Sequence, residues 1–254
     1  MMAAVDSTNA RVTTGCKELD IMLNGGLLTG SANLLEGAAG TGKSTLGVQF
    51  LMDGMKQGEN GLVITFEEFP EQYYDYAMEL GWDLRDMESK GLLDIIFTTP
   101  DEFMNLIYEE DNRLTQIIEE KSVKRALVDS VTNLEKLARD LGELREIETD
   151  LVNYFKREEI TTILLKENSS ILGGWNISKN KIPFIVDSYI ILRYLELESQ
   201  IKRGLMVLKM RGSNHTKEIR QYEIGKNGVS IGNTFQGISG LFLGTGRPVQ
   251  VPKK

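Results

Sequence analysis

A glycine-rich stretch at residues 37–44 constrains the fold of this chain more than any other feature. Its sequence, GAAGTGKS, fits the pattern G-x-x-x-x-G-K-[ST], in which consecutive backbone N–H groups converge on phosphate oxygens. An apolar run at residues 31–36 precedes it, and residues 45–52, which have helical spacing, follow it. The order is therefore strand, glycine loop and helix, and the helix N-terminus adds its partial positive charge to the loop.

This stretch predicts a binding site for the phosphates of ATP. We expect the Lys43 side chain to reach the β- and γ-phosphates and the Ser44 hydroxyl to ligate Mg²⁺. The alternative is a glycine turn that matches the pattern by chance, and the strand and helix on either side argue against it. The expected nucleotide-binding residues here are Gly37, Ala38, Ala39, Gly40, Thr41, Gly42, Lys43, Ser44 and Thr45.

Composition narrows the class of protein. With 254 residues and no linker-like stretch, we expect one large α/β domain. A net charge of -8 disfavours a broad surface for nucleic acid. The single cysteine, Cys16, excludes an intrachain disulfide, and with one histidine it also excludes a Cys/His zinc site. Because the sequence shows no apolar signal core and no long uncharged apolar run, we expect a cytoplasmic protein without membrane insertion.

The order of predicted elements indicates the fold class. Strands at residues 31–36, 61–66, 92–97, 126–130 and 160–165 alternate with a short helix within 13–27 that ends at a glycine pair, and with helices at 45–52, 73–80, 102–120 and 141–155. Strands then follow one another at 189–195, 205–209, 219–224 and 229–231. This pattern predicts a parallel core sheet that is flanked by helices and extended by antiparallel strands.

The predicted domain boundaries follow the same pattern. Residues 1–12 are polar and lack periodicity, which predicts a flexible N-terminal arm. Residues 13–231 form the predicted ATPase domain, with a mobile loop at 166–181. From residue 232 to 254, glycine and proline without a period predict a surface tail.

Three acidic residues stand where predicted strands end. Asp129 closes a buried strand and is the candidate for holding Mg²⁺ together with Ser44; the alternative is an aspartate that caps the next helix. Glu67 and Glu68 end the strand after the glycine-loop helix. Ligands of open α/β sheets bind at the carboxyl ends of the strands, so one of this pair is the candidate general base that orients the attacking water. The alternative is a solvated acidic turn.

Two cations end a strand that is distant in sequence from the glycine loop. Alternation puts Lys209 and Arg211 on one face, where they could neutralise γ-phosphate charge. On spacing alone, a solvated strand end is the favoured explanation of these two cations. For the only histidine, His215, the same reasoning favours a polar loop residue over a catalyst.

Taken together, several stretches resemble the KaiC-like branch of the RecA superfamily of ATPases. They lie at residues 14–15 with 19–20, 25–27, 37–44, 65–68, 81–84, 128–132 and 208–215, in one order between residues 14 and 231. The resemblance implies a three-layer RecA-like P-loop fold, a homo-hexameric ring and ATP at subunit interfaces. It also implies that Glu67 and Glu68 are the catalytic carboxylates. The residues that it places against the neighbouring subunit's nucleotide are Lys209, Met210, Arg211, Ser213 and His215.

The sequence also departs from that family. The best-known member has two tandem ATPase domains, whereas this sequence carries one copy. In that member's autokinase domain a Ser-Thr pair precedes the aspartate after the mobile loop, and here Pro183 and Phe184 stand before Asp187. Autokinase activity is therefore not expected. Other hydroxyls that could accept phosphate in principle are Ser169, Ser170, Ser178 and Ser188.

Three functional hypotheses follow. The first is a ring-forming ATPase whose slow hydrolysis of ATP at subunit interfaces drives or regulates contacts with an unidentified partner protein. The second is an ATP-dependent scaffold or switch with little hydrolysis, similar to the archaellum-assembly ATPases of this branch. The third is a recombinase-like, DNA-dependent ATPase, for which the loop at 166–181 offers only Lys166, Lys179, Lys181 and Trp175.

Overall fold

The computed structural model describes residues 10–109, 112–168, 182–197, 199–235, 238–240 and 247–248. Its strands are β1 (Arg11–Val12), β2 (Leu27–Leu28), β3 (Ala32–Gly37), β4 (Asn60–Thr65), β5 (Leu93–Phe97), β6 (Val123–Asp129), β7 (Thr161–Glu167), β8 (Ser188–Leu197), β9 (Gln200–Met210), β10 (Arg220–Gly225), β11 (Gly228–Thr234), β12 (Ile238–Ser239) and β13 (Arg247–Pro248). The helices are α1 (Lys17–Met22), α2 (Lys43–Lys56), α3 (Pro70–Glu79), α4 (Leu84–Ser89), α5 (Pro100–Tyr108), α6 (Arg113–Lys121), α7 (Val131–Glu135), α8 (Leu141–Arg157) and α9 (Ile182–Ile185).

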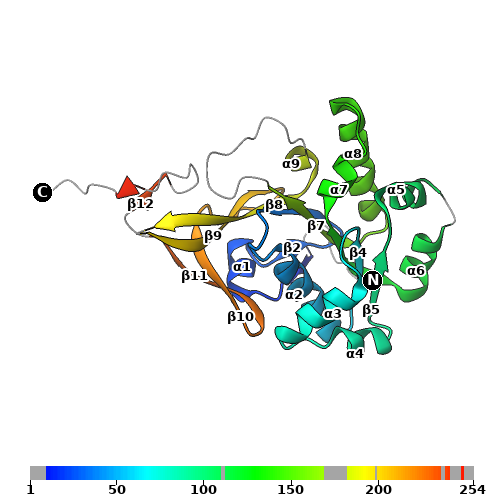
Figure 1. The fold of residues 1–254 in the computed structure, drawn as a ribbon, viewed down its shortest axis with the longest axis horizontal. Helices are drawn as coiled ribbons and strands as arrows, with labels where there is room; N and C mark the ends of the chain where they lie inside the picture. The colour runs from blue at the N-terminus through cyan, green and yellow to red at the C-terminus, as the bar shows by residue number, and fades with distance from the viewer. Residues whose placement is uncertain are drawn as a thin grey trace, which may run out of the picture.

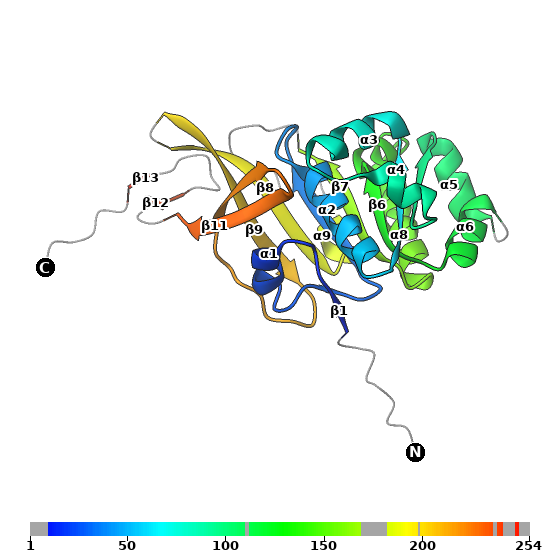
Figure 2. The same cartoon turned by 90° about the horizontal axis from the view of Figure 1, so that it is seen from below.

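Among the described residues, the central sheet has nine strands in the order β11-β10-β9-β8-β3-β7-β6-β4-β5. The six strands from β8 to β5 are parallel to one another, and β9, β10 and β11 continue the sheet in antiparallel pairing. Figures 1 and 2 both place this extension on the opposite side of the molecule from α5 and α6. The predicted parallel core with antiparallel continuation is confirmed.

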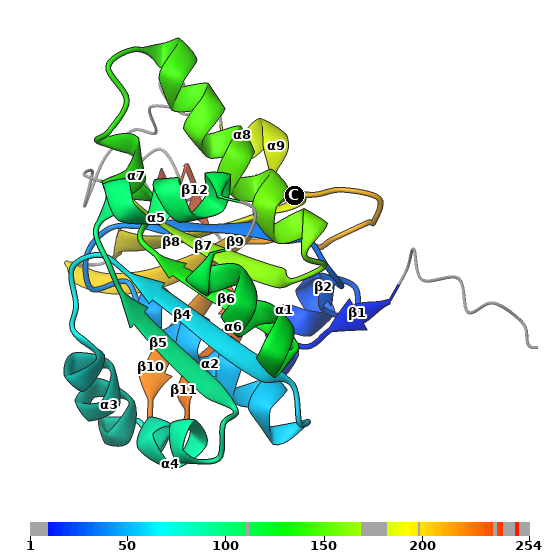
Figure 3. The same cartoon turned by 90° about the vertical axis from the view of Figure 1, so that its right-hand side faces the viewer.

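Helices cover both faces of the sheet, which gives three layers. Figure 3 shows α2, α3 and α4 on one face and α5, α8 and α9 on the other. Buried side chains form one cluster on each side, the first with α1 to α4 and the second with α5 to α8. The parallel strands carry continuous apolar runs because they are buried on both faces. Within the described part of the chain, no helix combines the length and apolarity needed to cross a bilayer.

The expected single helix at 102–120 is wrong. The structure has two helices there, because the chain becomes extended at Glu109 (ψ 131°) after α5. The buried Asn112 causes the break: its side-chain amide donates to the carbonyls of Leu106 and Glu109, and its Oδ1 caps α6 by accepting from Thr115 N. A polar side chain that bonds locally in this way competes with helix continuation.

The expected segment boundaries also need correction. Residues 11–12 are not part of a free arm, since β1 pairs with β2. The tail does not begin at 232, because β11 continues to Thr234 against Arg220. Lys166 and Glu167 belong to β7 rather than to a loop. The rest of the expected arm, residues 1–9, and the expected loop at 169–181 lie outside the described residues.

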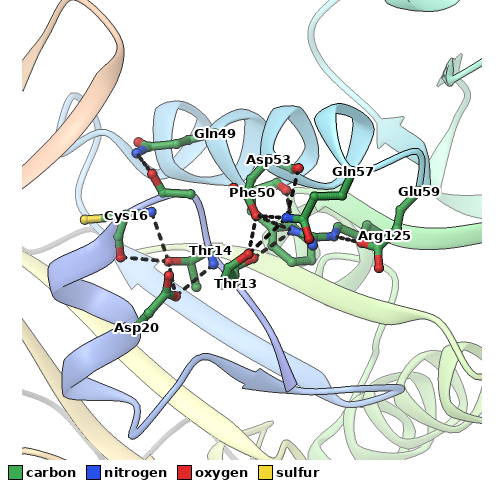
Figure 4. A network of polar contacts seen from close by, with 11 residues as sticks. Thr13, Thr14, Cys16, Asp20, Gln49, Phe50, Asp53, Gln57, Glu59 and Arg125 are labelled. Atoms are coloured by element: carbon green, nitrogen blue, oxygen red, sulfur yellow. Dashed lines mark hydrogen bonds and ion pairs between the residues drawn. The ribbon is translucent and has the colours of Figure 1, made fainter. Parts of the chain in front are cut away.

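A buried arginine ties the N-terminal segment to the core (Figure 4). The Arg125 side chain is only 1% exposed, and its Nε donates to Glu59 Oε2 over 2.5 Å. Its Nη1 donates to the carbonyls of Thr13 and Phe50 over 2.7 and 2.9 Å. A buried charge needs such partners to offset the loss of hydration. Arg125 therefore joins the end of β1, helix α2 and strand β6.

Gln49, on the same helix, makes a second link, which Figure 4 shows in part. Its Nε2 donates to the Gly15 carbonyl over 2.7 Å, and its Oε1 accepts from Val229 N over 2.8 Å. The amide is buried between the N-terminal segment and β11. Helix α2 thus holds two distant parts of the chain through side-chain to backbone hydrogen bonds.

We predict that Gly54→Ala destabilises the protein by about 2–4 kcal/mol, because overpacking and disturbed buried ion pairs each cost this much. A Cβ at Gly54 would lie 2.3 Å from Arg125 Nε. In the control Gly232→Ala, the nearest atom to the new Cβ is 3.6 Å away, so the change should stay within about 0.5 kcal/mol. Denaturant unfolding measures both, and equal effects would contradict the packing argument.

Candidate nucleotide-binding site

The glycine loop joins β3 directly to α2 and has the backbone shape that its sequence predicts. Gly42 immediately precedes α2 with φ 92°, a left-handed conformation that favours glycine. A Cβ at Gly37 would lie 2.6 Å from Thr41 Oγ1, and one at Gly42 would lie 2.5 Å from Ile224 Cδ1. The Thr41 hydroxyl closes the loop by donating to the Ala38 carbonyl over 2.7 Å. Only glycine fits at these two close approaches.

The Ser44 and Asp129 side chains, predicted from separate motifs, meet in the structure. Ser44 Oγ donates to Asp129 Oδ2 over 2.8 Å. Parallel pairing accounts for the meeting, since Asp129 aligns with Thr65 on β4 and with Leu165 on β7, beside the loop that follows β3. A hydroxyl and a carboxylate side by side form the oxygen donor set that Mg²⁺ prefers. The residues present therefore fit the expected metal.

Tyr73, which was not among the predicted site residues, also contacts Asp129. Its hydroxyl donates to Asp129 Oδ2 over 2.7 Å, and burial together with the Asp129 charge raises the pKa of Tyr73 well above its usual value. In the sequence, Tyr73 belongs to the apolar face of α3. A buried tyrosine hydroxyl usually has a polar hydrogen-bond partner, and this rule could have drawn attention to Tyr73.

The structure distinguishes the two neighbouring glutamates. Glu68 lines the cavity beside the glycine loop, and burial, with the Asp129 and Glu67 charges, raises its pKa. Both glutamates are exposed, but Glu67 does not line the cavity and lies 3.6 Å from Lys136 Nζ in an ion pair between two exposed side chains. Of the pair, Glu68 is the carboxylate that faces the loop.

Ser44 and Glu68 line a cavity of about 430 Å³ beside the glycine loop. This volume is within the range of small-molecule sites, roughly 300–1,000 Å³. Lys43 lies at its wall and donates to the Ala38 carbonyl over 3.1 Å; burial lowers its pKa, while the Glu167 and Asp129 charges oppose that shift. The cavity is lined by Gly40, Gly42, Lys43, Ser44, Thr45, Glu68, Gln72, Tyr76 and Ile224.

The segment at 209–215 does not reach this cavity within one chain. Antiparallel pairing sets Lys209 against Tyr189, and Arg211 N donates to the Asp187 carbonyl beside the start of β3. Strand β3 runs from Ala32 to Gly37, where the glycine loop begins. At about 3.3 Å per residue, the two ends of this strand are about 17 Å apart. The two cations do lie together, since Lys209 Nζ and Arg211 Nη2 both donate to the Phe184 carbonyl, over 3.4 and 2.8 Å.

The other predicted members of this segment lie nearby. Ser213 Oγ accepts from Asn24 over 3.4 Å, and His215 N donates to Asn214 Oδ1 over 3.0 Å. Met210 is buried at the end of β9. This end of the sheet is the one at which β3 begins, opposite to the end that carries the glycine loop.

Two residues considered for other roles are buried in structural contacts. Lys166, considered for DNA binding, is 2% exposed and pairs with Glu135. Ser188, considered as a phosphate acceptor, is 1% exposed and donates to Asn33 Oδ1 over 2.7 Å. The remaining candidates for those roles, Ser169, Ser170, Trp175, Ser178, Lys179 and Lys181, lie outside the described residues.

The phosphate loop between β3 and α2, with the acidic end of β6 beside it, makes this chain a RecA-like P-loop nucleotide-binding domain. The family profile described as "ATPase: KaiC" matches residues 12–235. The chain therefore belongs to the KaiC family of ATPases.

Individual relatives agree with this assignment. The "Circadian clock protein KaiC3" of Synechocystis sp. is 38% identical over 242 residues, which cover 94% of this chain and 47% of that protein. The "Circadian clock oscillator protein KaiC" of Acaryochloris marina is 35% identical over 250 residues, which cover 98% of this chain and 47% of that protein. The protein of the same name from Thermostichus vulcanus is 33% identical over 255 residues, which again cover 98% of this chain and 47% of that protein. The chain spans about half the length of these relatives.

Tyr73→Phe should destabilise the protein by about 1.5–3 kcal/mol, because it removes a buried hydrogen bond to a charged group. Tyr74→Phe is the matched control, since the Tyr74 hydroxyl donates over 2.6 Å to Glu88, which is exposed. Its loss should cost less than about 1 kcal/mol. Thermal or denaturant unfolding of both variants provides the measurement, and a larger effect for Tyr74→Phe would refute the assigned role of the Tyr73 contact.

Proposed function

We propose that this chain binds ATP with Mg²⁺ at the P-loop and hydrolyses it slowly at the interfaces of a homo-hexameric ring in the cytoplasm. The contact between Ser44 and Asp129 is the observation that carries the proposal. It joins the loop to the acidic strand end, with Glu68 in the same cavity. The family assignment supports ATP as the nucleotide.

In the proposed reaction, each side chain has one task. The loop N–H groups and Lys43 hold the phosphates, and Ser44 and Asp129 hold the metal. Mg²⁺, when held there, would neutralise phosphate charge. Glu68 orients a water molecule toward the γ-phosphorus and accepts its proton, while the bond between the γ-phosphorus and the β-phosphate oxygen breaks and ADP leaves. A raised pKa suits this task, since a base works best with a pKa closer to the working pH.

The position of Lys209 and Arg211 supports a site that two chains share. They lie at the end of the sheet opposite to their own P-loop, so they can reach a γ-phosphate only on a neighbouring copy. Contacts of this head-to-tail kind close into rings when the rotation between copies allows it. Met210, Ser213 and His215 belong to the same segment and would contact the same neighbour.

Regulation of an unidentified partner protein is part of the proposal, because a shared site couples the state of the nucleotide to the contacts between subunits. The matched relatives are named as circadian clock proteins. A clock role is not proposed for this chain, since a fold alone does not determine the process that it serves.

Glu68→Gln should lower the rate of phosphate release by about 10²–10⁴-fold, the usual contribution of a general base. Nucleotide affinity should persist, since the carboxylate is not needed to hold phosphates. Glu67→Gln is the control and should change the rate less than about tenfold, because its side chain faces solvent and Lys136. If a double variant that carries both Glu67→Gln and Glu68→Gln releases phosphate as fast as wild type, hydrolysis by this route is refuted and the scaffold alternative is favoured.

Arg211→Ala should keep ATP binding but lower turnover by about 10³-fold or more, the usual effect of losing an arginine finger. Lys217→Ala removes an exposed cation six residues further along and should have little effect. Mixing Arg211→Ala with Lys43→Ala protein should restore part of the turnover, because mixed rings contain some intact interfaces. The mass of the assembly in solution, measured with and without ATP, tests whether a ring forms. Unchanged turnover in Arg211→Ala would reject the shared site.

A further inference from the structure

Strand β9 is irregular just before the two cations that end it. Val207 pairs with Ile190 and Lys209 pairs with Tyr189, so Leu208 is an extra residue in the register with β8. Ile190 belongs to the buried cluster with α1 to α4 and Tyr189 to the cluster with α5 to α8, and directly opposite residues share a face. Strict alternation would keep Lys209 on the face of Val207. The bulge therefore turns it to the face that carries α8 and α9.

On this face, a short segment between α9 and β8 receives both cations. The Asp187 carbonyl accepts from Arg211 N over 2.7 Å, and Arg211 Nη1 lies 3.9 Å from Asp187 Oδ1. Lys209 Nζ donates to the Val186 carbonyl over 2.7 Å, in addition to the contacts of both cations with the Phe184 carbonyl. Asp187 thus supplies the carboxylate against which the Arg211 guanidinium lies.

The Asp187 carboxylate is itself held from two other sides. Its Oδ2 accepts from Ala32 N over 3.0 Å, and Lys156 Nζ, from α8, donates to its Oδ1 over 2.9 Å. Burial lowers the pKa of Lys209, and the Arg211 and Lys156 charges add to that shift while the Asp187 charge opposes it. The carboxylate therefore offsets part of the repulsion between cations that would otherwise push one another away.

This arrangement matters for direction more than for stability. The Arg211 side chain is 53% exposed, and ion pairs of exposed side chains add little to stability. An arginine that is already held in place loses less side-chain freedom when it binds a partner. Its guanidinium carries five N–H groups, so donors remain for a phosphate. A misplacement of about 1 Å at a reacting centre costs about 10²-fold in rate.

We propose that Asp187 is a positioning residue for the shared site, whose carboxylate holds Arg211 in the direction from which the guanidinium reaches the γ-phosphate of a neighbouring copy. The inference rests on the proposed function, because it assumes that Arg211 acts on that neighbour. In its own chain, Asp187 lies beside the start of β3, at the end opposite to the P-loop. Its loss should therefore leave nucleotide binding by the same chain intact.

Asp187→Asn tests the role of the charge, since it keeps the size of the side chain and one acceptor oxygen. Phosphate release by the full chain, measured against ATP concentration, should show kcat lower by about 10²-fold. KM should change less than about twofold, because the contact acts in the transition state and not in ATP binding. Unchanged kcat would overturn the proposal.

Lys156→Met is the matched control, because it removes the other charged partner of Asp187 and leaves the contact with Arg211. It should destabilise the fold, yet change kcat less than about threefold. If Asp187→Asn does not fold because Lys156 is left unpaired, the double variant with Lys156→Met removes that penalty and should lose turnover as stated. An equal loss of turnover in Lys156→Met alone would assign the effect to the ion pair with α8 and contradict the positioning role.

A double-mutant cycle gives a readout that a merely structural role would not move. Added to Arg211→Ala, Asp187→Asn should lower kcat by less than about threefold, since no guanidinium is left to position. A further loss of about 10²-fold would show independent effects and reject the proposal. In mixed assemblies, Asp187→Asn should recover turnover with Lys43→Ala but not with Arg211→Ala, because Asp187 and Arg211 lie on the same side of the interface.

These results separate the positioning role from the proposed function. If Arg211→Ala itself keeps wild-type turnover, the shared site fails whatever Asp187→Asn does. If Arg211→Ala loses turnover while Asp187→Asn keeps it, the shared site stands and the positioning role alone is refuted.

Discussion

Parallel pairing of β3, β7, β6 and β4 is the constraint on which the nucleotide site depends. It brings the carboxyl ends of four strands to one edge of the sheet, so the loop after Gly37, the carboxylate of Asp129 and the turn at Glu68 become neighbours although they lie far apart in the sequence. No single segment contains this site. Because register sets the alignment, a slip of one strand would move Asp129 away from Ser44 and also turn its buried side chains to the wrong face.

The same pairing explains what the sequence could predict. The glycine loop, Asp129 and Glu68 stand at strand ends, and strand ends can be read from apolar runs. Tyr73 and Tyr76 could not be found in this way, because on a helix a tyrosine that packs in the core and one that serves a site have the same spacing. The helix break at Asn112 was missed for a related reason, since its cause is a set of hydrogen bonds to backbone groups rather than a change in hydrophobic period.

The antiparallel direction of β9 places Lys209 and Arg211 at the end of the sheet that is opposite to the glycine loop. An antiparallel strand ends where its parallel neighbours begin, so these cations lie near the start of β3. The spacing in the sequence paired them correctly with each other but held no information about which end of the sheet they occupy. Their distance from their own P-loop is a property of the topology.

Gln49 connects helix α2, which begins at the phosphate loop, to two other parts of the chain. Its amide bonds the segment before α1 through Gly15 and the last strand of the sheet through Val229. Buried hydrogen bonds of this kind are costly to break, so a shift of α2 carries both attachments with it. Helix α2 therefore joins the phosphate loop to two segments that are distant in sequence, and one of these attachments, Val229, pairs with Ile224 in the wall of the cavity.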